Sequence, residues 1–309
     1  MKVNARPVLF LMIAGGLLCF TLSFFTCHKD IPSVTVESPG TFKIETVTES
    51  RMGGSAFAES IASLGLVRRE RAIFSEIIQG NLPDFLRELV PIHFTSTLGD
   101  SIYRITIFVT PDYLSIGKDE DHFLIPMTPM LAQRIMDRID GVLPTAKMVD
   151  AIWKAAQLKL EPQPIPPSDA MVDMTVFGQH NRMVQQSRNA TLEALPLPTL
   201  VAGHKKDVIL SNRIAAQPDK VVIYGWHELD GKNIQPVYSG HINWYVDYSH
   251  GIRPVLSRCL VNGLEMRIAD ILRDPILFQL LSDETAQMEI TRYDTSVSNY
   301  PRDEPIILP

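Results

Sequence analysis

The sequence predicts an α+β fold, in which helices pack on one face of an antiparallel sheet. Two observations predict it. β-Rich segments fill two blocks of the chain, with helical segments between and after them. In the second block, Asp-Gly and Asn-Gly pairs separate β-rich flanks, as they do in antiparallel hairpins. The 309 residues, 45% of them apolar, are enough for a large core. We therefore expect one domain over residues 67–309, with a candidate subdomain boundary near residues 161–168.

The N-terminus predicts export. Lys2 and Arg6 precede the uncharged residues 7–26, a pattern typical of an export signal or a membrane anchor. The apolar run is just long enough to span a bilayer. In one interpretation Cys27 becomes the lipidated first residue of a bacterial lipoprotein, and in the other residues 1–27 stay as an anchor. Both place the rest of the chain outside the cytoplasm, attached to the membrane. Residues 28–66 are rich in Ser, Thr and Gly and are predicted to form a tether.

Composition excludes some functions. The chain has 29 basic and 35 acidic residues and a net charge of −6, which argues against a nucleic-acid partner. Cys259 is the one cysteine of the body, and we expect a buried, apolar role for it. Histidine or cysteine pairs at the spacing of a metal site are absent, so no metal is predicted. The sequence leaves any cofactor unknown.

The first part of the expected domain alternates between helices and strands. Residues 67–89 have helical periodicity that is interrupted near Gly80. Thr128, as a cap before Pro129, predicts that a helix begins there. The predicted elements, in order, are a helix over 67–89, strands over 92–97, 103–110 and 122–127, and helices over 128–139, 146–158 and 176–193.

The second part, from Leu200 onward, returns to strands. Asp230-Gly231 lies between β-rich residues 221–229 and 232–238, and Asn262-Gly263 lies between 257–261 and 264–268. Both pairs favour the positive φ angles of a type I′ turn, so both segments are predicted hairpins. Residues 269–284 are predicted to be helical, with a break at Pro275.

Reactive side chains gather between Val201 and Arg253. Four of the eight histidines lie in this stretch, among tryptophans, tyrosines, lysines and aspartates. Such a cluster predicts a site. Residues 240–249 alternate as in a strand, whose side chains point to opposite faces. The expected core face carries Ile242, Trp244, Val246 and Tyr248, and the expected functional face carries His241, Asn243, Tyr245, Asp247 and Ser249.

The residues that follow this stretch carry two resemblances. Ser249-His250-Gly251-Ile252-Arg253 resembles the Ser-His-Gly-Cys-Ile-Arg signature of L,D-transpeptidases. The nucleophilic cysteine of that signature is absent, because Ile252 follows Gly251 directly, so the activity is not carried over. The blocks HKKDVILSN (204–212) and WYVDYSHGIR (244–253) are similar to those of an uncharacterised group of secreted bacterial proteins. That resemblance implies no known activity.

Candidate roles follow from side-chain chemistry. His241, Asp247 and His250 are the acid–base candidates, and Ser249 is a candidate nucleophile that His241 or His227 would activate. Otherwise, His227 in an apolar strand is expected to be half-buried, and His180 is expected at the surface of a polar helix. The predicted substrate-binding residues are His204, Lys206 and Asp207 at the rim of the sheet, the rings of Trp226 and Tyr245, and the guanidinium of Arg253.

The reaction stays open at this point. Hydrolysis of a glycoside would need two carboxylates, for which Asp207 and Asp247 are available, with Glu228 and Asp230 as substitutes. His and Tyr acting as acid and base would instead suit elimination or hydrolysis at an acidic sugar or a peptide. Our hypothesis is an exported, envelope-associated, hydrolase-like enzyme, or a lyase, that acts on a cell-wall or other extracellular polymer such as peptidoglycan. The alternatives are a non-catalytic lipoprotein that binds a glycan or protein through an aromatic face, and a purely structural envelope protein.

Overall fold

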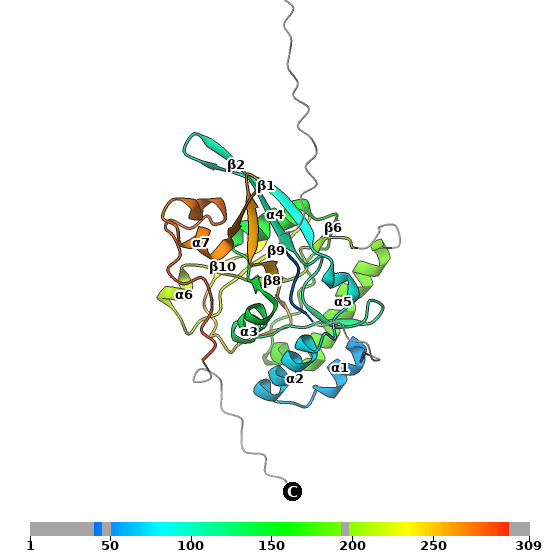
Figure 1. The fold of residues 1–309 in the computed structure, drawn as a ribbon. Helices are drawn as coiled ribbons and strands as arrows, with labels where there is room; N and C mark the ends of the chain where they lie inside the picture. Colours follow the sequence, from blue (N-terminus) through cyan, green and yellow to red (C-terminus); the bar gives the residue numbers. More distant parts are fainter. Residues whose placement is uncertain (1–39, 45–50, 193–197, 297–309) are drawn as a thin grey trace, which may run out of the picture. The chain divides into compact units, whose positions relative to one another are not determined.

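A computed structural model of the chain describes residues 40–44, 51–192 and 198–296 (Figure 1). Helices and largely antiparallel sheets confirm the α+β prediction. The described residues form one compact unit, which continues through the proline-rich residues 161–168. Cys27 and the predicted membrane segment lie outside the described residues. Within the described ranges, no helix is long and apolar enough to cross a membrane.

The first helices show that the predicted tether is too long. Residues 51–66 contain α1 (Gly54–Ser60), and its Phe57 is buried. A Cβ added to Gly54 would lie 2.4 Å from the backbone nitrogen of Phe123. Glycine here therefore allows close packing of two backbones, whereas composition alone suggested flexibility. The predicted helix at 67–89 is present as α2 (Leu66–Ile78), followed by the 3-10 turn η1 (Asp84–Arg87).

The larger sheet is antiparallel and has six strands, which are β1 (Val90–Leu98), β2 (Ser101–Val109), β5 (Gly141–Val142), β12 (Val255–Leu256), β13 (Arg258–Val261) and β14 (Leu264–Arg267). β2 is central and pairs with β1, β12 and β13. The β13–β14 turn confirms the predicted type I′ hairpin, since Asn262 and Gly263 have φ angles of 51° and 84°.

A second sheet of four strands lies in the order β10-β9-β8-β11. Its strands are β8 (Lys206–Val208), β9 (Ile223–His227), β10 (Asn233–Tyr238) and β11 (His250–Gly251). β11 is parallel to β8, and the other pairs are antiparallel. The predicted β9–β10 hairpin is present, but its turn is wider than predicted: Glu228 N donates to Lys232 O, and only Gly231 of the Asp-Gly pair has a positive φ.

Two short strand pairs and the remaining helices complete the unit. The pairs are β3 (Ser115–Gly117) with β4 (His122–Leu124), and β6 (Leu158–Lys159) with β7 (Val201–Ala202). The helices and 3-10 turns are α3 (Pro129–Ile139), α4 (Ala146–Ala155), η2 (Asp169–Val172), α5 (Met174–Leu192), α6 (Arg213–Ala216), α7 (Ile268–Arg273) and η3 (Leu277–Leu280). The helices predicted at 128–139, 146–158 and 176–193 correspond to α3, α4 and α5.

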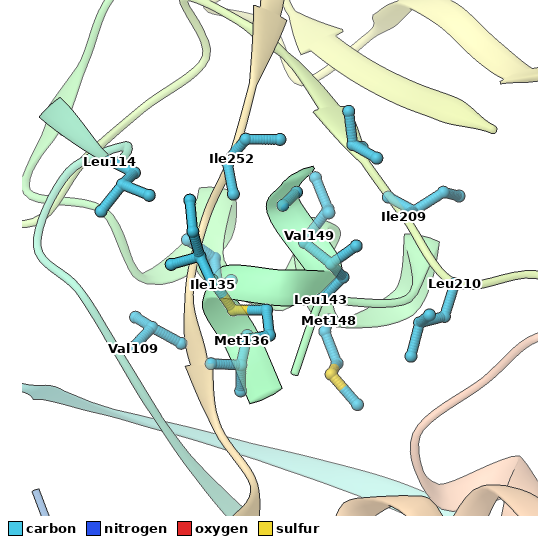
Figure 2. Packing of buried hydrophobic residues seen from close by; sticks show 14 of the residues in the cluster. Val109, Leu114, Ile135, Met136, Leu143, Met148, Val149, Ile209, Leu210 and Ile252 are labelled. Carbon is cyan, nitrogen blue, oxygen red and sulfur yellow. The ribbon is translucent and has the colours of Figure 1, made fainter. Parts of the chain in front are cut away.

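The core lies where α3 and α4 meet the strands. The Thr128 hydroxyl accepts a hydrogen bond from Leu131 N at 3.2 Å, and that of Thr145 accepts one from Met148 N at 3.3 Å. These side-chain caps start α3 and α4. Figure 2 shows the packing of buried side chains, which include Val109, Leu114, Ile135, Met136, Leu143, Met148, Val149, Ile209, Leu210 and Ile252.

Candidate functional site

The predicted strand over residues 240–249 is wrong. The segment is irregular, and a turn in which Tyr245 N donates to Ile242 O at 2.9 Å breaks the two-residue period. The predicted division into a core face and a functional face also fails. Trp244, predicted in the core, is 41% exposed, whereas Asp247, predicted on the functional face, is 3% exposed. Ser249, from the same predicted face, is also buried.

The irregular segment nevertheless brings several predicted residues together. Its His241 ring stacks on that of Tyr245, with centroids 4.1 Å apart. Tyr245 Oη donates a 3.1 Å hydrogen bond to Asp247 Oδ2. His250 on β11 lies beside Lys206 on β8, since the two residues are partners in the parallel ladder. We call Lys206, His241, Tyr245, Asp247 and His250 the outer cluster.

The pKa values within the outer cluster are shifted from those of free side chains. Burial lowers the pKa of His241, and it lowers the pKa of His250 to about 4. Burial pushes the pKa of Asp247 upward, but His250, the bonded Ser249 and Lys206 bring that pKa below its ordinary value. At pH 7 the cluster therefore contains two neutral imidazoles and an ionised carboxylate.

Ser249 is placed as a support for Asp247. Its backbone N–H and its hydroxyl both donate to Asp247 Oδ1, at 2.8 and 2.5 Å. A hydroxyl that donates to a carboxylate is not being activated by an imidazole. This geometry favours a structural role for Ser249 over the predicted nucleophile.

A second group of polar residues lies deeper. We call Asp112, Tyr113, Arg188, His204, Asp207 and Arg253 the inner network. The Asp112 carboxylate lies 3.3 Å from Arg188 Nε and 3.2 Å from His204 Nε2. Burial raises the pKa of Asp112, but the neighbouring His204 and Arg188 outweigh it and hold that pKa well below its usual range.

Arg253 and Asp207 belong to the same network. Arg253 donates to Thr110 O at 2.9 Å and to Val201 O at 2.6 Å, with its guanidinium 4.2 Å from the centre of the Tyr113 ring. Tyr113 Oη donates to Asp207 Oδ2 at 2.8 Å, and burial raises the pKa of Asp207 to about 6.

The inner network corrects three predicted binding residues. His204, Asp207 and Arg253 were expected at an open rim of the sheet, yet each is at most 2% exposed. The rim is covered by Asp112 and Tyr113, which follow β2, and by Arg188 of α5. Arg253 already donates to two carbonyl oxygens, so it is not available as the predicted anion fork.

Lys205 and Lys206 are adjacent but lie in different surroundings. Lys205 Nζ is buried, where it donates to Tyr248 O at 2.6 Å and faces His180 Nδ1 at 3.2 Å. Burial lowers the pKa of Lys205 to about 7. His180 is therefore interior, not at the surface as predicted, because its helix turns this polar side chain toward the sheet. Lys206 is half-buried, with its ammonium 4.5 Å from the centre of the Trp226 ring.

β9 contains a strained turn of the backbone. Gly225 and Trp226 have φ angles of 104° and 57°, and a positive φ at a bulky residue costs on the order of 1–3 kcal/mol. Trp226 is consequently buried beneath Lys206, although the sequence predicted contact with a substrate. The next residue, His227, is buried rather than half-buried, and its Nε2 lies 3.0 Å from Asp150 Oδ1.

Three remaining predictions can be placed. Asp207 and Asp247 do not form a carboxylate pair, because Asp207 belongs to the inner network and Asp247 to the outer cluster. Glu228 and Asp230 line a separate hollow at the β9–β10 turn. Cys259 is buried, as predicted, and burial raises its pKa to about 12. In the described part of the chain, no three His, Cys, Asp or Glu residues are grouped to hold a metal.

Three residues of these contacts, Asp112, Arg188 and Asp150, were not predicted from the sequence. Asp112 and Asp150 are distant in sequence from residues 201–253, and they are the acidic partners of His204 and His227. Arg188, on α5, is the basic partner of Asp112. No local pattern marks them. Comparison with models of known families, with curated proteins and with solved structures gives no match.

Proposed function

We propose that the chain is an exported, envelope-associated, hydrolase-like enzyme that acts on a cell-wall or other extracellular polymer. Its active site would be the outer cluster. The observation that supports this proposal is the stack of His241 on Tyr245, both half-buried, beside Lys206 and above the ionised Asp247. Perturbed titratable groups that converge from separate segments are typical of acid–base sites.

His241 is the proposed general base. Burial keeps its imidazole neutral at pH 7, so it can accept a proton from a water molecule that attacks the substrate. Tyr245 holds the ring in place by stacking, and Asp247 holds Tyr245 through its hydrogen bond. Lys206 would stabilise the negative charge that develops on the substrate. The rings of Tyr238 and Trp244, each 41% exposed, would pack against the substrate.

A non-catalytic protein remains the second candidate, and the same aromatic side chains support it. Tyr238, Trp244 and Tyr245 offer exposed or half-exposed rings, which suit a glycan or a protein partner. A non-catalytic binding protein needs these rings but does not need a neutral His241. The two candidates therefore make different predictions: only the enzyme degrades the polymer, and its rate depends on the His241 imidazole.

The decisive experiment uses the full chain, purified in detergent, and isolated cell-wall polymer as the substrate. Release of soluble fragments is measured by chromatography for the wild type and for His241→Gln. We expect the substitution to lower the rate by about 10²–10⁴-fold, because a general base contributes that much. His93→Gln, on the exposed side of β1, is the matched control and should keep the wild-type rate.

Two results would contradict the proposed enzymatic function. One is an unchanged rate in His241→Gln. The other is a wild-type chain that binds the polymer but releases nothing, which would favour the binding protein. Equilibrium unfolding of each variant should show a change within about 1 kcal/mol, so that a lost rate is not a lost fold.

A further inference from the structure

The face of α5 that packs on the rest of the molecule contains titratable and charged side chains. Between residues 174 and 190, the buried side chains of this helix recur every three or four residues, as on one helical face, and they are Met174, Phe177, His180, Val184 and Arg188. His180 and Arg188 are at most 4% exposed, and the outer cluster contains neither of them. The contacts of these two side chains therefore help to decide how firmly α5 is held.

The first contact joins α5 to the residue before β8. Lys205 Nζ lies 3.2 Å from His180 Nδ1 and donates to Tyr248 O at 2.6 Å, and the Tyr248 ring lies 4.8 Å from that of His180. His180 Nδ1 accepts a hydrogen bond from Lys205 only while it carries no proton. Burial lowers the pKa of Lys205 to about 7, so below that pH a proton added to His180 would meet an ammonium.

The second contact repeats this arrangement two turns further along α5. Arg188 Nη1 lies 3.2 Å from Nε2 of His122, on β4. The other ring nitrogen of His122 lies 3.2 Å from Asp119 O, which can only accept a hydrogen bond. Nδ1 of His122 therefore carries the proton, and its Nε2 is the acceptor for Arg188. A proton added to Nε2 would face a guanidinium, which is charged at every ordinary pH.

The carboxylates nearby do not offset these repulsions. Burial and the Arg188 guanidinium lower the pKa of His122, although Asp112 attracts a proton to it. Burial, followed by the Lys205 ammonium and His204, lowers the pKa of His180. Asp247 and Asp112 favour the charged form of the lysine, which strengthens the repulsion. Both imidazoles are therefore held neutral while α5 is in place.

We propose that α5 is a proton-operated cover, which detaches from the rest of the molecule when His122 and His180 take up protons. Each imidazole accepts from a cation across the same interface, so protonation of either one places two positive charges about 3 Å apart. Detachment separates each pair and lets water solvate the charges. It also exposes Lys205 and Asp112, which α5 covers. The inference does not rest on the enzymatic activity proposed above.

The sign and size of the effect follow from proton binding. Detachment returns both imidazoles to an ordinary pKa of 6.5, so the detached state binds more protons and is favoured as the pH falls below 6.5. From pH 7 to pH 5, two such groups raise the equilibrium constant for detachment by at most about 600-fold, and one group by at most about 25-fold. Lys205 titrates above this range and adds about a factor of two.

The test is amide hydrogen exchange of the full chain, in detergent, at pH 7, 6 and 5. Each rate is corrected for the intrinsic pH dependence of exchange, which gives the equilibrium constant for opening of each segment. For α5 that constant should rise at least about 30-fold from pH 7 to pH 5. For α3, which contains neither histidine, it should rise much less.

Variants with a matched side chain assign the effect to the two imidazoles. His122→Gln and His180→Gln each keep an oxygen that can accept from the facing cation, but glutamine does not titrate. Each single variant should reduce the rise at α5 at least about threefold, and the double variant should reduce it to less than about threefold in all. His93→Gln, at an exposed position of β1, is the control and should keep the wild-type response.

Three outcomes would overturn the proposal. The opening constant of α5 is the same at pH 5 and pH 7, or α5 and α3 respond equally because the whole molecule unfolds, or the double variant keeps the wild-type response. Thermal melting at pH 7 checks that each variant is folded. The comparison of α5 with α3 in the wild type needs no variant, so it decides the matter even where a substitution prevents folding.

Discussion

The inner network and the outer cluster use the same kinds of residue in opposite ways. Each contains at least one carboxylate, at least one imidazole and a tyrosine, and both draw on the β8–β11 region. In the inner network, Asp112, Asp207 and Arg253 find their partners inside the protein. In the outer cluster, His241 and Tyr245 are stacked but half-exposed. Surroundings, rather than residue type, separate a stabilising polar group from one that is free to react.

Lys205 and Lys206 show this difference at the start of one strand. Lys205 directly precedes β8 and Lys206 begins it, and successive side chains of an extended backbone point to opposite faces. Lys205 is therefore enclosed with Tyr248 and His180, whereas Lys206 lies over Trp226 in the outer cluster. We expect substitutions of buried groups, which include the whole inner network and His250 of the outer cluster, to change stability, and substitutions of exposed or half-exposed groups in or near the outer cluster to change activity or binding. Three experiments test that expectation.

The largest effect should come from Asp112→Asn. The substitution leaves the buried Arg188 without its carboxylate, and breaking a buried ion pair costs about 3–5 kcal/mol. Urea denaturation measures the loss. Asp100→Asn, at the exposed β1–β2 turn, is the control and should change the free energy of unfolding by less than about 0.5 kcal/mol. If Asp112→Asn lowered the free energy of unfolding by less than about 1 kcal/mol, the inner network would not have the stabilising role that we assign to it.

An intermediate effect concerns pH. The pKa of His250 is about 4 in the folded protein, against an ordinary value of 6.5. Between these two pH values the unfolded chain binds more protons, so the free energy of unfolding falls as the pH falls. For this one group the slope is at most about 1.4 kcal/mol per pH unit.

His250→Phe isolates that contribution. Denaturation curves at pH 7, 6, 5 and 4 should give a shallower loss of stability for the variant than for the wild type. The remaining slope would combine the other imidazoles of lowered pKa, His122, His180, His204 and His241, with an opposite contribution from Asp207, whose pKa burial raises to about 6. Parallel curves for variant and wild type would show that His250 does not titrate in this range.

The smallest effect on stability should come from Trp244→Ala, although its effect on binding should be clear. Trp244 is exposed, so we expect the free energy of unfolding to change by less than about 0.5 kcal/mol. Affinity for cell-wall glycan should fall roughly tenfold, which corresponds to about 1.4 kcal/mol. Leu264→Ala, on the exposed β13–β14 hairpin, is the control for binding. Equal affinity in both variants would exclude Trp244 from the binding surface.

Parts of the fold were predictable because their signals are local. A threonine cap predicted the start of α3, and Asn262-Gly263 predicted its turn. Residues 240–249 misled because their two-residue alternation is accidental. The turn at Ile242–Tyr245 contains neither glycine nor proline, so nothing in the pattern marks it.

The candidate site was predictable only in part, for the same reason. His241, Asp247 and His250 were found because they are close in sequence and also meet in space. The burial of His204 and Arg253 depends on residues more than 50 positions away, as does the pairing of His227 with Asp150. A single sequence contains the members of these contacts but no local mark of the contacts themselves.

The positive φ of Trp226 has a consequence for protein engineering. Glycine at this position would relieve about 1–3 kcal/mol of backbone strain, but it would also remove a buried indole, which costs about 3–5 kcal/mol. The same change would free the Lys206 ammonium from its position over the ring. Backbone geometry alone would therefore select a substitution at position 226 that lowers stability and loosens the outer cluster, and a stabilised version of this protein should leave its tryptophan in place.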